Sequence, residues 1–339
     1  MIAVAVAIAA CLLIVLWLSA SAPMKRETEL RARVVLPRTE LCERTSRIFV
    51  SVASYRDQLC TTTLASMVSR ARYPMRVYAG VYEQNAEASE TCTVDAKYQA
   101  NVRVTSVHAR EARGPCAARY RCSMLMRGEE IFLQIDSHTE FTQDWDVMAV
   151  HMLQDLRGAQ EGSVVISTYP IDCSGGWEQS DPPVIDRSKY NGSWITFEAT
   201  VRGEARKIVA PSRQIGGGFL LCVASVVRHV PFDPGLDGVF NNEELLYTAR
   251  LFTHGIDVVA PRQNLVCHKY FYGEHRTVWT DNPSWNADRR GNERADTMLS
   301  GQNAALFDAY GMGKVRSLDE FWAHVAINYP ARTVSESWT

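Results

Sequence analysis

Short apolar runs alternate with longer amphipathic stretches through the first half of the chain. Ile48–Ala53 is an apolar, β-branched run with the length of a buried strand, and Leu59–Ala71 after it has helical spacing. The same order recurs, so that we expect strands at 75–82, 101–107, 130–135 and 164–168 and helices at 115–126 and 145–156. Strands that alternate with helices predict an α/β fold with a mostly parallel sheet.

The second half of the chain is less regular. Residues 171–207 are rich in polar residues and turn formers, and we expect a long functional loop there. Three glycines at 216–218 precede the apolar stretch Phe219–Val227. Further elements are expected as a helix at 243–252, strands at 256–260 and 265–272, and an amphipathic helix at 321–327 after the capping box of Ser317 and Glu320.

The first apolar run, Ile2–Leu18, has no charged residue and is about the shortest that spans a bilayer as a helix. It predicts a signal anchor or a signal peptide cleaved among the small residues 19–22. The run lacks a preceding charged segment, which favours the anchor, but basic residues follow it and leave the orientation open. We therefore expect an anchor or signal peptide at 1–22, a stem at 23–46 and the main domain at 47–330.

Composition narrows the class of protein. Lys plus Arg is 36 and Asp plus Glu is 38, and no basic stripe is present, which argues against a nucleic-acid-binding protein. Nine cysteines are present, one of them in the first apolar run. The remaining eight suit a compartment that permits disulfides, although their spacing fixes no pairing. No Cys-x-x-Cys spacing occurs, so structural zinc is not expected.

Polar clusters follow three of the predicted strands, at Ser54–Asp57, Glu83 and Asp136–His138. In sheets of this class, ligands bind beyond the carboxyl ends of the strands. Alternate residues of an extended chain point the same way, so Asp136 and His138 can converge on a divalent ion such as Mn²⁺. His268, in a distant predicted strand, can supply a third ligand. On spacing alone, an ordinary turn is a more common explanation of Asp-x-His than a metal site.

The chain resembles the polypeptide α-N-acetylglucosaminyltransferases, which include the Skp1 hydroxyproline enzymes and the trypanosomatid mucin-type enzymes. An ordered set of segments between residues 47 and 272 carries the resemblance. These are Ile48–Asp57, Gly114–Pro115, Ala118–Tyr120, Leu133–His138 with Phe141, Trp145–Asp146, Ser167–Pro170, Pro231–Pro234, Glu243–Glu244, and His268 with Tyr270. The resemblance implies a GT-A glycosyltransferase fold with a nucleotide-binding half and an acceptor-binding half.

The resemblance also implies a UDP-sugar donor, a divalent metal, retention of the anomeric configuration and a polypeptide acceptor. The implied metal ligands are Asp136, His138 and His268. The residues implied to bind the nucleotide sugar are Ser54, Tyr55, Arg56, Glu83, Arg119 and Asp136. The residues implied at the reaction centre are Glu243, Glu244 and Asp233. The implied enzyme transfers N-acetylglucosamine to a Ser, Thr or hydroxyproline hydroxyl. The apolar run Ile2–Leu18 adds the expectation of a single-pass membrane protein in the Golgi or another secretory compartment.

The chain departs from the family pattern in its acceptor half. Asn241 and Asn242 precede the acidic pair where a small residue is expected, and Cys267 precedes His268 where an aromatic residue is usual. These departures leave open a glycan or glycolipid acceptor and a catalytically silent module that binds sugar nucleotide. Secretion and a cytoplasmic location are the alternatives to membrane anchoring.

Overall fold

The computed structural model describes residue 36 and residues 39–159, 164–191, 194–201, 210–240, 242–270, 276–282, 290–302 and 307–334. All of them belong to one compact unit, Ala32–Thr339. The predicted anchor or signal peptide at 1–22 and the first part of the predicted stem lie outside the described residues. Within the described part of the chain, no helix combines the length and the apolar character that crossing a bilayer requires.

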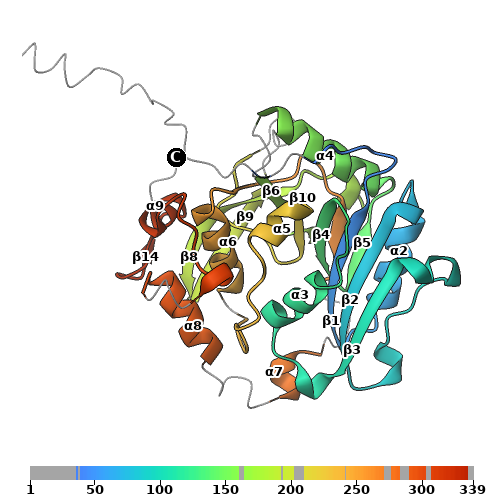
Figure 1. Cartoon of the computed structure of the whole chain (residues 1–339), viewed down its shortest axis with the longest axis horizontal. Coiled ribbons are helices and arrows are strands. Elements are labelled where there is room, and N and C mark those ends of the chain that lie inside the picture. The colour runs from blue at the N-terminus through green and yellow to red at the C-terminus, as the bar shows by residue number, and fades with distance from the viewer. Residues whose placement is uncertain are drawn as a thin grey trace, which may run out of the picture. The chain divides into compact units, whose positions relative to one another are not determined.

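A seven-stranded sheet lies at the centre of the fold (Figure 1). Its spatial order is β11 (Asp257–Val259), β6 (Val164–Ser167), β10 (Phe219–Val223), β4 (Ile131–Asp136), β1 (Ile48–Tyr55), β2 (Val77–Asn85) and β3 (Val102–His108). Strand β1 pairs in parallel with β2 and β4, β2 with β3, and β6 with β11. Only β10 runs antiparallel to its neighbours in this sheet. The predicted, mostly parallel α/β sheet is therefore confirmed.

Helices pack on this sheet and bury its strands. Helix α3 (Pro115–Ser123) packs on β1 and β2, and α5 (Ala224–His229) packs on β4 and β10. Helix α4 (Trp145–Ala159) packs on β10, and α2 (Cys60–Ser69) packs on the short strand β5 (Thr139–Phe141). Nearly every residue of β1, β4 and β10 is buried, as expected of strands covered on both faces.

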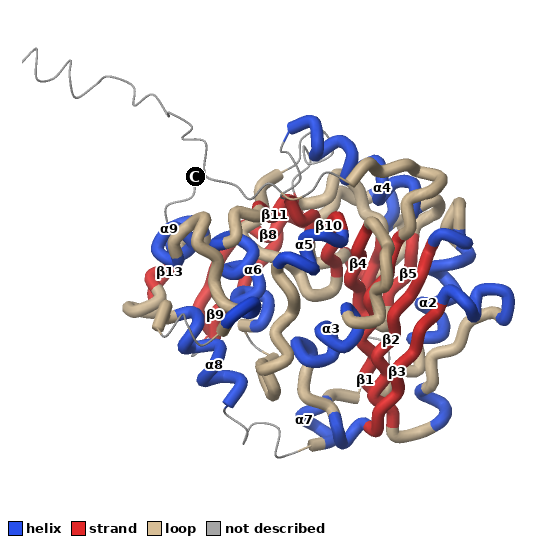
Figure 2. The backbone as a smooth tube through the Cα atoms, in the orientation of Figure 1, coloured by secondary structure: helices blue, strands red, loops and turns tan. Residues whose placement is uncertain are grey.

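A second core forms around α6 (Glu243–Thr253), which packs against α8 (Arg290–Leu299) and α9 (Leu318–His324) (Figure 2). The capping box predicted for Ser317 and Glu320 begins α9. Other short elements are α7 (Val278–Asp281), β13 (Ile327–Asn328) and β14 (Thr333–Val334).

The prediction of a long loop at 171–207 is wrong. The structure places a short strand, β7 (Ile171–Asp172), and a hairpin of β8 (Pro183–Asn191) and β9 (Trp194–Val201) within it. In β9, Ile195 and Phe197 are buried in the second core while the residues between them face solvent. This alternation of buried and exposed positions forms a half-buried strand, although the segment as a whole is polar.

A three-stranded sheet, β5–β12–β7, stands beside the main sheet and carries His268 at the end of β12 (Val266–His268). Strand β12 is shorter than the predicted 265–272. A disulfide between Cys173 and Cys267 joins β12 to the residue after β7, and a second links Cys60 to Cys92. Four other cysteines of the described residues are free thiols, at 42, 116, 122 and 222.

Candidate active site

A cavity of about 800 Å³ opens at the carboxyl ends of β1, β2 and β4. Tyr55, Gln84 and Asp136, which end these strands, line it. The start of α3 forms a second wall, and the start of α6 with Glu243 and Glu244 forms a third. The volume is in the range of small-molecule sites, and the position matches the expected one at the strand ends.

Asp136 and His138 line this cavity and His268 lies beside them, so the fold brings the three predicted ligands together. Their ligand atoms all lie within 4.8 Å of one another. Pairing of His268 with Thr139 in the small sheet brings β12 beside the end of β4. Nε2 of His268 lies 3.0 Å from Oδ2 of Asp136. Burial alone would raise the pKa of the Asp136 carboxyl, but the hydrogen bond with His268 and nearby positive charge hold it well below its usual range.

These three residues fit a divalent metal ion. One carboxylate oxygen with two imidazole nitrogens is a donor set that suits Mn²⁺ and similar ions. Nδ1 of His268 is buried and has no hydrogen-bond partner among the described residues. Gly218 leaves room beside the carboxylate, since a Cβ there would lie 3.0 Å from Oδ2 of Asp136. Nδ1 of the third side chain, His138, contacts the carboxylate of Asp57, which was not predicted as a site residue.

Glu243 and Glu244 begin α6, where the helix dipole favours negative charge. Glu243 forms a hydrogen-bonded ion pair with the buried Arg119 of α3. The Oε1 of Glu244 accepts from the backbone N–H of Gly217, and its Oε2 accepts from Tyr169 Oη at 2.9 Å. Burial and the negative charge of Glu243 raise the pKa of Glu244 to about 7, against these hydrogen bonds.

The partners of Glu244 were not predicted individually. Gln214 also donates to Oε2 of Glu244, at 3.2 Å, and to Tyr169 Oη, at 2.8 Å. At Gly217, a Cβ would lie 2.4 Å from Nη2 of Arg119 and 3.0 Å from Oε1 of Glu244. The three glycines at 216–218 were the available signal, because such a run indicates a close approach of the backbone to other groups.

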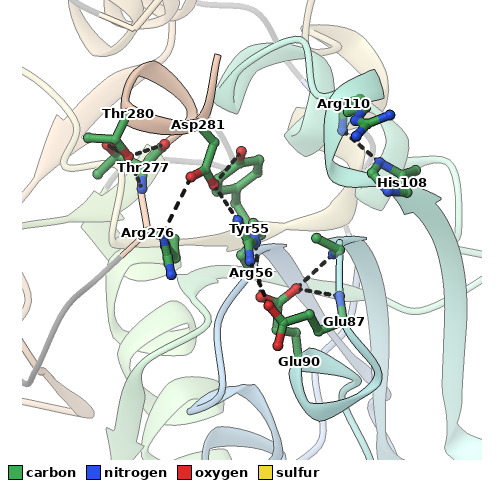
Figure 3. A network of polar contacts seen from close by, with 11 residues as sticks. Tyr55, Arg56, Glu87, Glu90, His108, Arg110, Arg276, Thr277, Thr280 and Asp281 are labelled. Atoms are coloured by element: carbon green, nitrogen blue, oxygen red, sulfur yellow. Dashed lines mark hydrogen bonds and ion pairs between the residues drawn. The ribbon is translucent and has the colours of Figure 1, made fainter. Parts of the chain in front are cut away.

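The Arg56 side chain lies at the cavity, but carboxylates hold its guanidinium (Figure 3). Its Nε donates to Glu90 at 2.9 Å, its Nη1 to Asp281 at 2.9 Å, and its Nη2 lies 3.3 Å from Glu87. The Tyr55 hydroxyl also donates to Asp281, at 3.1 Å. Tyr55 and Arg56 thus fasten α7 to the end of β1, and this contact brings residues 276–279 to the cavity wall.

Four predicted site residues do not line the cavity, and the first of them, His268, reaches it only through its contact with Asp136. Ser54 follows the alternation of β1 and points away from the face of Tyr55, into the buried interior. The buried carboxylate of Glu83 accepts from the Cys92 N–H at 2.9 Å and from Ser106 Oγ at 2.6 Å. Asp233 accepts from Nε of Arg294 at 2.8 Å, below the start of α6.

Comparison with known proteins identifies the family. The family model described as "Glycosyltransferase (GlcNAc)" matches residues 47–101 and 93–330. The crystal structure of GalNAc-T7 with UDP, GalNAc and Mn²⁺ has a TM-score of 0.51 at 13% identity, over 83% of this chain. The chain spans 57% of the length of that protein. Residues 1–349 of S. aureus TarS give a TM-score of 0.49 at 12% identity, over 84% of this chain and 71% of the other.

No curated protein matches the chain. The likeness to GalNAc-T7 bears on the fold, which is the GT-A glycosyltransferase fold that the resemblance implied. The family model extends over more than half of the chain and includes Asp136, His138, His268 and the acidic pair of α6. The chain is therefore a member of the glycosyltransferase (GlcNAc) family.

Proposed function

We propose that this chain is a metal-dependent, retaining glycosyltransferase that transfers N-acetylglucosamine from a UDP-sugar to a hydroxyl group of a polypeptide. The observation that carries the proposal is the cluster of Asp136, His138 and His268, of which Asp136 and His138 line the same cavity as Glu243 and Glu244. A cation site beside a half-buried carboxylate pair suits a donor with an anionic diphosphate and a polar sugar.

Two comparisons support the donor. The family description names GlcNAc, and the GalNAc-T7 structure, which shares the fold, holds UDP, a sugar and Mn²⁺. Asp136, His138 and His268 would hold the divalent ion, which when bound would offset negative charge on the leaving diphosphate. Arg119 lines the same cavity, and its guanidinium carries a permanent positive charge that is also paired with Glu243.

The carboxylates favour one of two routes to retention. A double displacement needs a carboxylate nucleophile with an accessible oxygen. Both oxygens of Glu244 accept hydrogen bonds from protein groups, and Glu243 is paired with Arg119. We therefore propose attack by the acceptor hydroxyl on the face that the diphosphate leaves, with the hydroxyl proton passing to the departing phosphate oxygen. Glu243 and Glu244 then bind sugar or acceptor hydroxyls instead of forming a bond to the sugar.

The mouth of the cavity supports a bulky acceptor. Phe240 and Trp279 line it with exposed fractions of 47% and 41%, and their rings meet edge to face with centroids 4.7 Å apart. Exposed aromatic rings at a binding site commonly bury an apolar part of a partner. A polypeptide segment that carries the hydroxyl group provides such surface.

A location in the secretory pathway, with the run Ile2–Leu18 as membrane anchor, is part of the proposal. The two disulfides, Cys60–Cys92 and Cys173–Cys267, support it, because disulfides persist mainly in oxidising compartments.

The test is a donor panel on the full-length protein. UDP release is followed from several UDP-sugars, with a peptide acceptor, in Mn²⁺ and in chelator. Asp136→Asn is compared with Asp144→Asn, a control that removes a surface carboxylate paired with Arg72. We expect turnover of UDP-GlcNAc that requires Mn²⁺, survives in the control and falls at least about a hundredfold in Asp136→Asn, since an oxyanion-stabilising group contributes that much. Equal turnover in chelator, or in Asp136→Asn, would refute the metal-dependent transferase.

A further inference from the structure

The Asp57 side chain faces the back of the predicted metal site. Its Oδ2 lies 2.7 Å from Nδ1 of His138. Asp57 follows β1, and His138 follows β4, the parallel neighbour of β1 in which Ala53 pairs with Asp136. The two loops therefore leave the sheet side by side, and a residue four positions beyond Ala53 reaches a residue two positions beyond Asp136.

The Asp57 carboxylate is fixed at more than one point. Its Oδ1 accepts from the backbone N–H of Leu59 at 2.8 Å, and its Oδ2 also accepts from Ser137 Oγ at 2.6 Å. Only 9% of the residue is exposed. The Cys60–Cys92 disulfide ties down the chain three residues later. These contacts fix the orientation of the buried Asp57 carboxylate. The His138 imidazole therefore adopts the orientation that places its Nδ1 against this carboxylate.

Hydrogen bonding decides which nitrogen of the imidazole carries the proton. A neutral imidazole has one N–H and one lone pair, and a carboxylate that accepts from other donors pairs with the N–H. The contact with Asp57 therefore places the proton on Nδ1 and the lone pair on Nε2. Metal-binding histidines usually have such a partner behind them, which raises their basicity and fixes the ring. His268 differs, because its Nδ1 has no partner among the described residues.

We infer that Asp57 is a positioning residue that fixes the ring and the tautomer of His138 and thereby sets the affinity of the Asp136–His138–His268 cluster for a divalent cation. This inference rests on the metal site of the proposed function. It assigns a role to a residue outside the predicted ligand set, and the role acts through His138.

The test measures Mn²⁺ binding to the full-length, metal-free protein by calorimetry, without substrate or turnover. Asp57→Asn keeps the shape of the side chain but offers an N–H₂ group that stabilises the opposite tautomer. We expect it to weaken Mn²⁺ binding by about 10- to 100-fold, the usual effect of removing such a partner. Asp144→Asn is the control, because it removes a surface carboxylate paired with Arg72 and leaves the contact of Asp57 with His138. It should change the affinity by less than about threefold, since the ring keeps its partner.

A second measurement needs no folded Asp57 variant. Long-range ¹H–¹⁵N spectra of the wild-type protein report the tautomer of each histidine, and His138→Gln identifies the signal of His138. We expect the Nδ1–H tautomer for His138 in the metal-free protein. The opposite tautomer, or an Asp57→Asn protein that binds Mn²⁺ like wild type, would overturn the role of Asp57. Wild-type protein that binds no Mn²⁺ would refute the metal site itself, an outcome distinct from the loss confined to Asp57→Asn.

Discussion

Glu244 should make the stability of the metal-free protein depend on pH. Its pKa rises from 4.5 to about 7 in the folded protein because burial and the charge of Glu243 disfavour the ionised form. A group with a raised pKa contributes stability that is complete below its unfolded pKa and is lost as the pH rises through the folded pKa. Each pKa unit corresponds to about 1.4 kcal/mol, so ionisation of Glu244 lowers the free energy of unfolding by about 3 kcal/mol between pH 4.5 and pH 8.

Glu244→Gln removes this titration and keeps the shape of the side chain. The amide oxygen can still accept from the Gly217 N–H, and the amide N–H₂ can donate to Tyr169 Oη. We expect the variant to match wild type near pH 5 and to exceed its free energy of unfolding by about 3 kcal/mol at pH 8. Urea unfolding in chelator from pH 5 to pH 8 measures the difference, with the exposed Glu178→Gln as control. Parallel curves for wild type and Glu244→Gln would refute a raised pKa at this carboxylate.

Three further substitutions test other contacts. Asp146→Asn breaks a fully buried ion pair with Arg76, whose Nη2 lies 2.9 Å from Oδ2 of Asp146. Urea unfolding should show a free energy of unfolding lower by about 3–5 kcal/mol, well beyond the effect of a surface pair. Asp281→Asn weakens the attachment of α7 to Arg56. We expect faster hydrogen exchange in the peptide 276–282 and a higher KM for the donor. Unchanged exchange would contradict the attachment. Gly217→Ala places a Cβ 2.4 Å from Nη2 of Arg119, and transfer assays should show at least about a tenfold loss of kcat/KM with little loss of thermal stability.

Two central strands could be predicted because their runs are mostly apolar, with Ser51 the one polar residue in 48–53 and Glu130 and Gln134 the polar residues in 130–135. Ile48–Ala53 and 130–135 have no polar alternation to confuse with a helix, and both become strands buried on two faces. The hairpin of β8 and β9 could not be predicted in the same way. Its buried residues, such as Ile195 and Phe197, alternate with exposed ones inside a segment whose average composition is that of a loop.

The candidate site was predictable where its residues follow strands and match a family motif. Asp136, His138 and His268 meet as expected. The environment of Arg56 was not predictable, because its carboxylate partners come from two distant segments, one with Glu87 and Glu90 and one with Asp281, that only the fold brings together. The role of Asp57 likewise depends on the pairing of β1 with β4, which places two loops distant in sequence at hydrogen-bond distance.

The disulfide between Cys173 and Cys267 makes maturation of the proposed metal site a chemical event as well as a folding event. Strand β12 has only three residues, and Cys267 directly precedes His268 within it. A strand this short has few backbone hydrogen bonds, so the covalent link to the chain after β7 carries much of its attachment. We expect chain made under reducing conditions to form the seven-stranded sheet and yet leave His268 loosely held. Protein produced in a reducing cytosol would then be folded by most criteria but deficient in cation binding until it is oxidised.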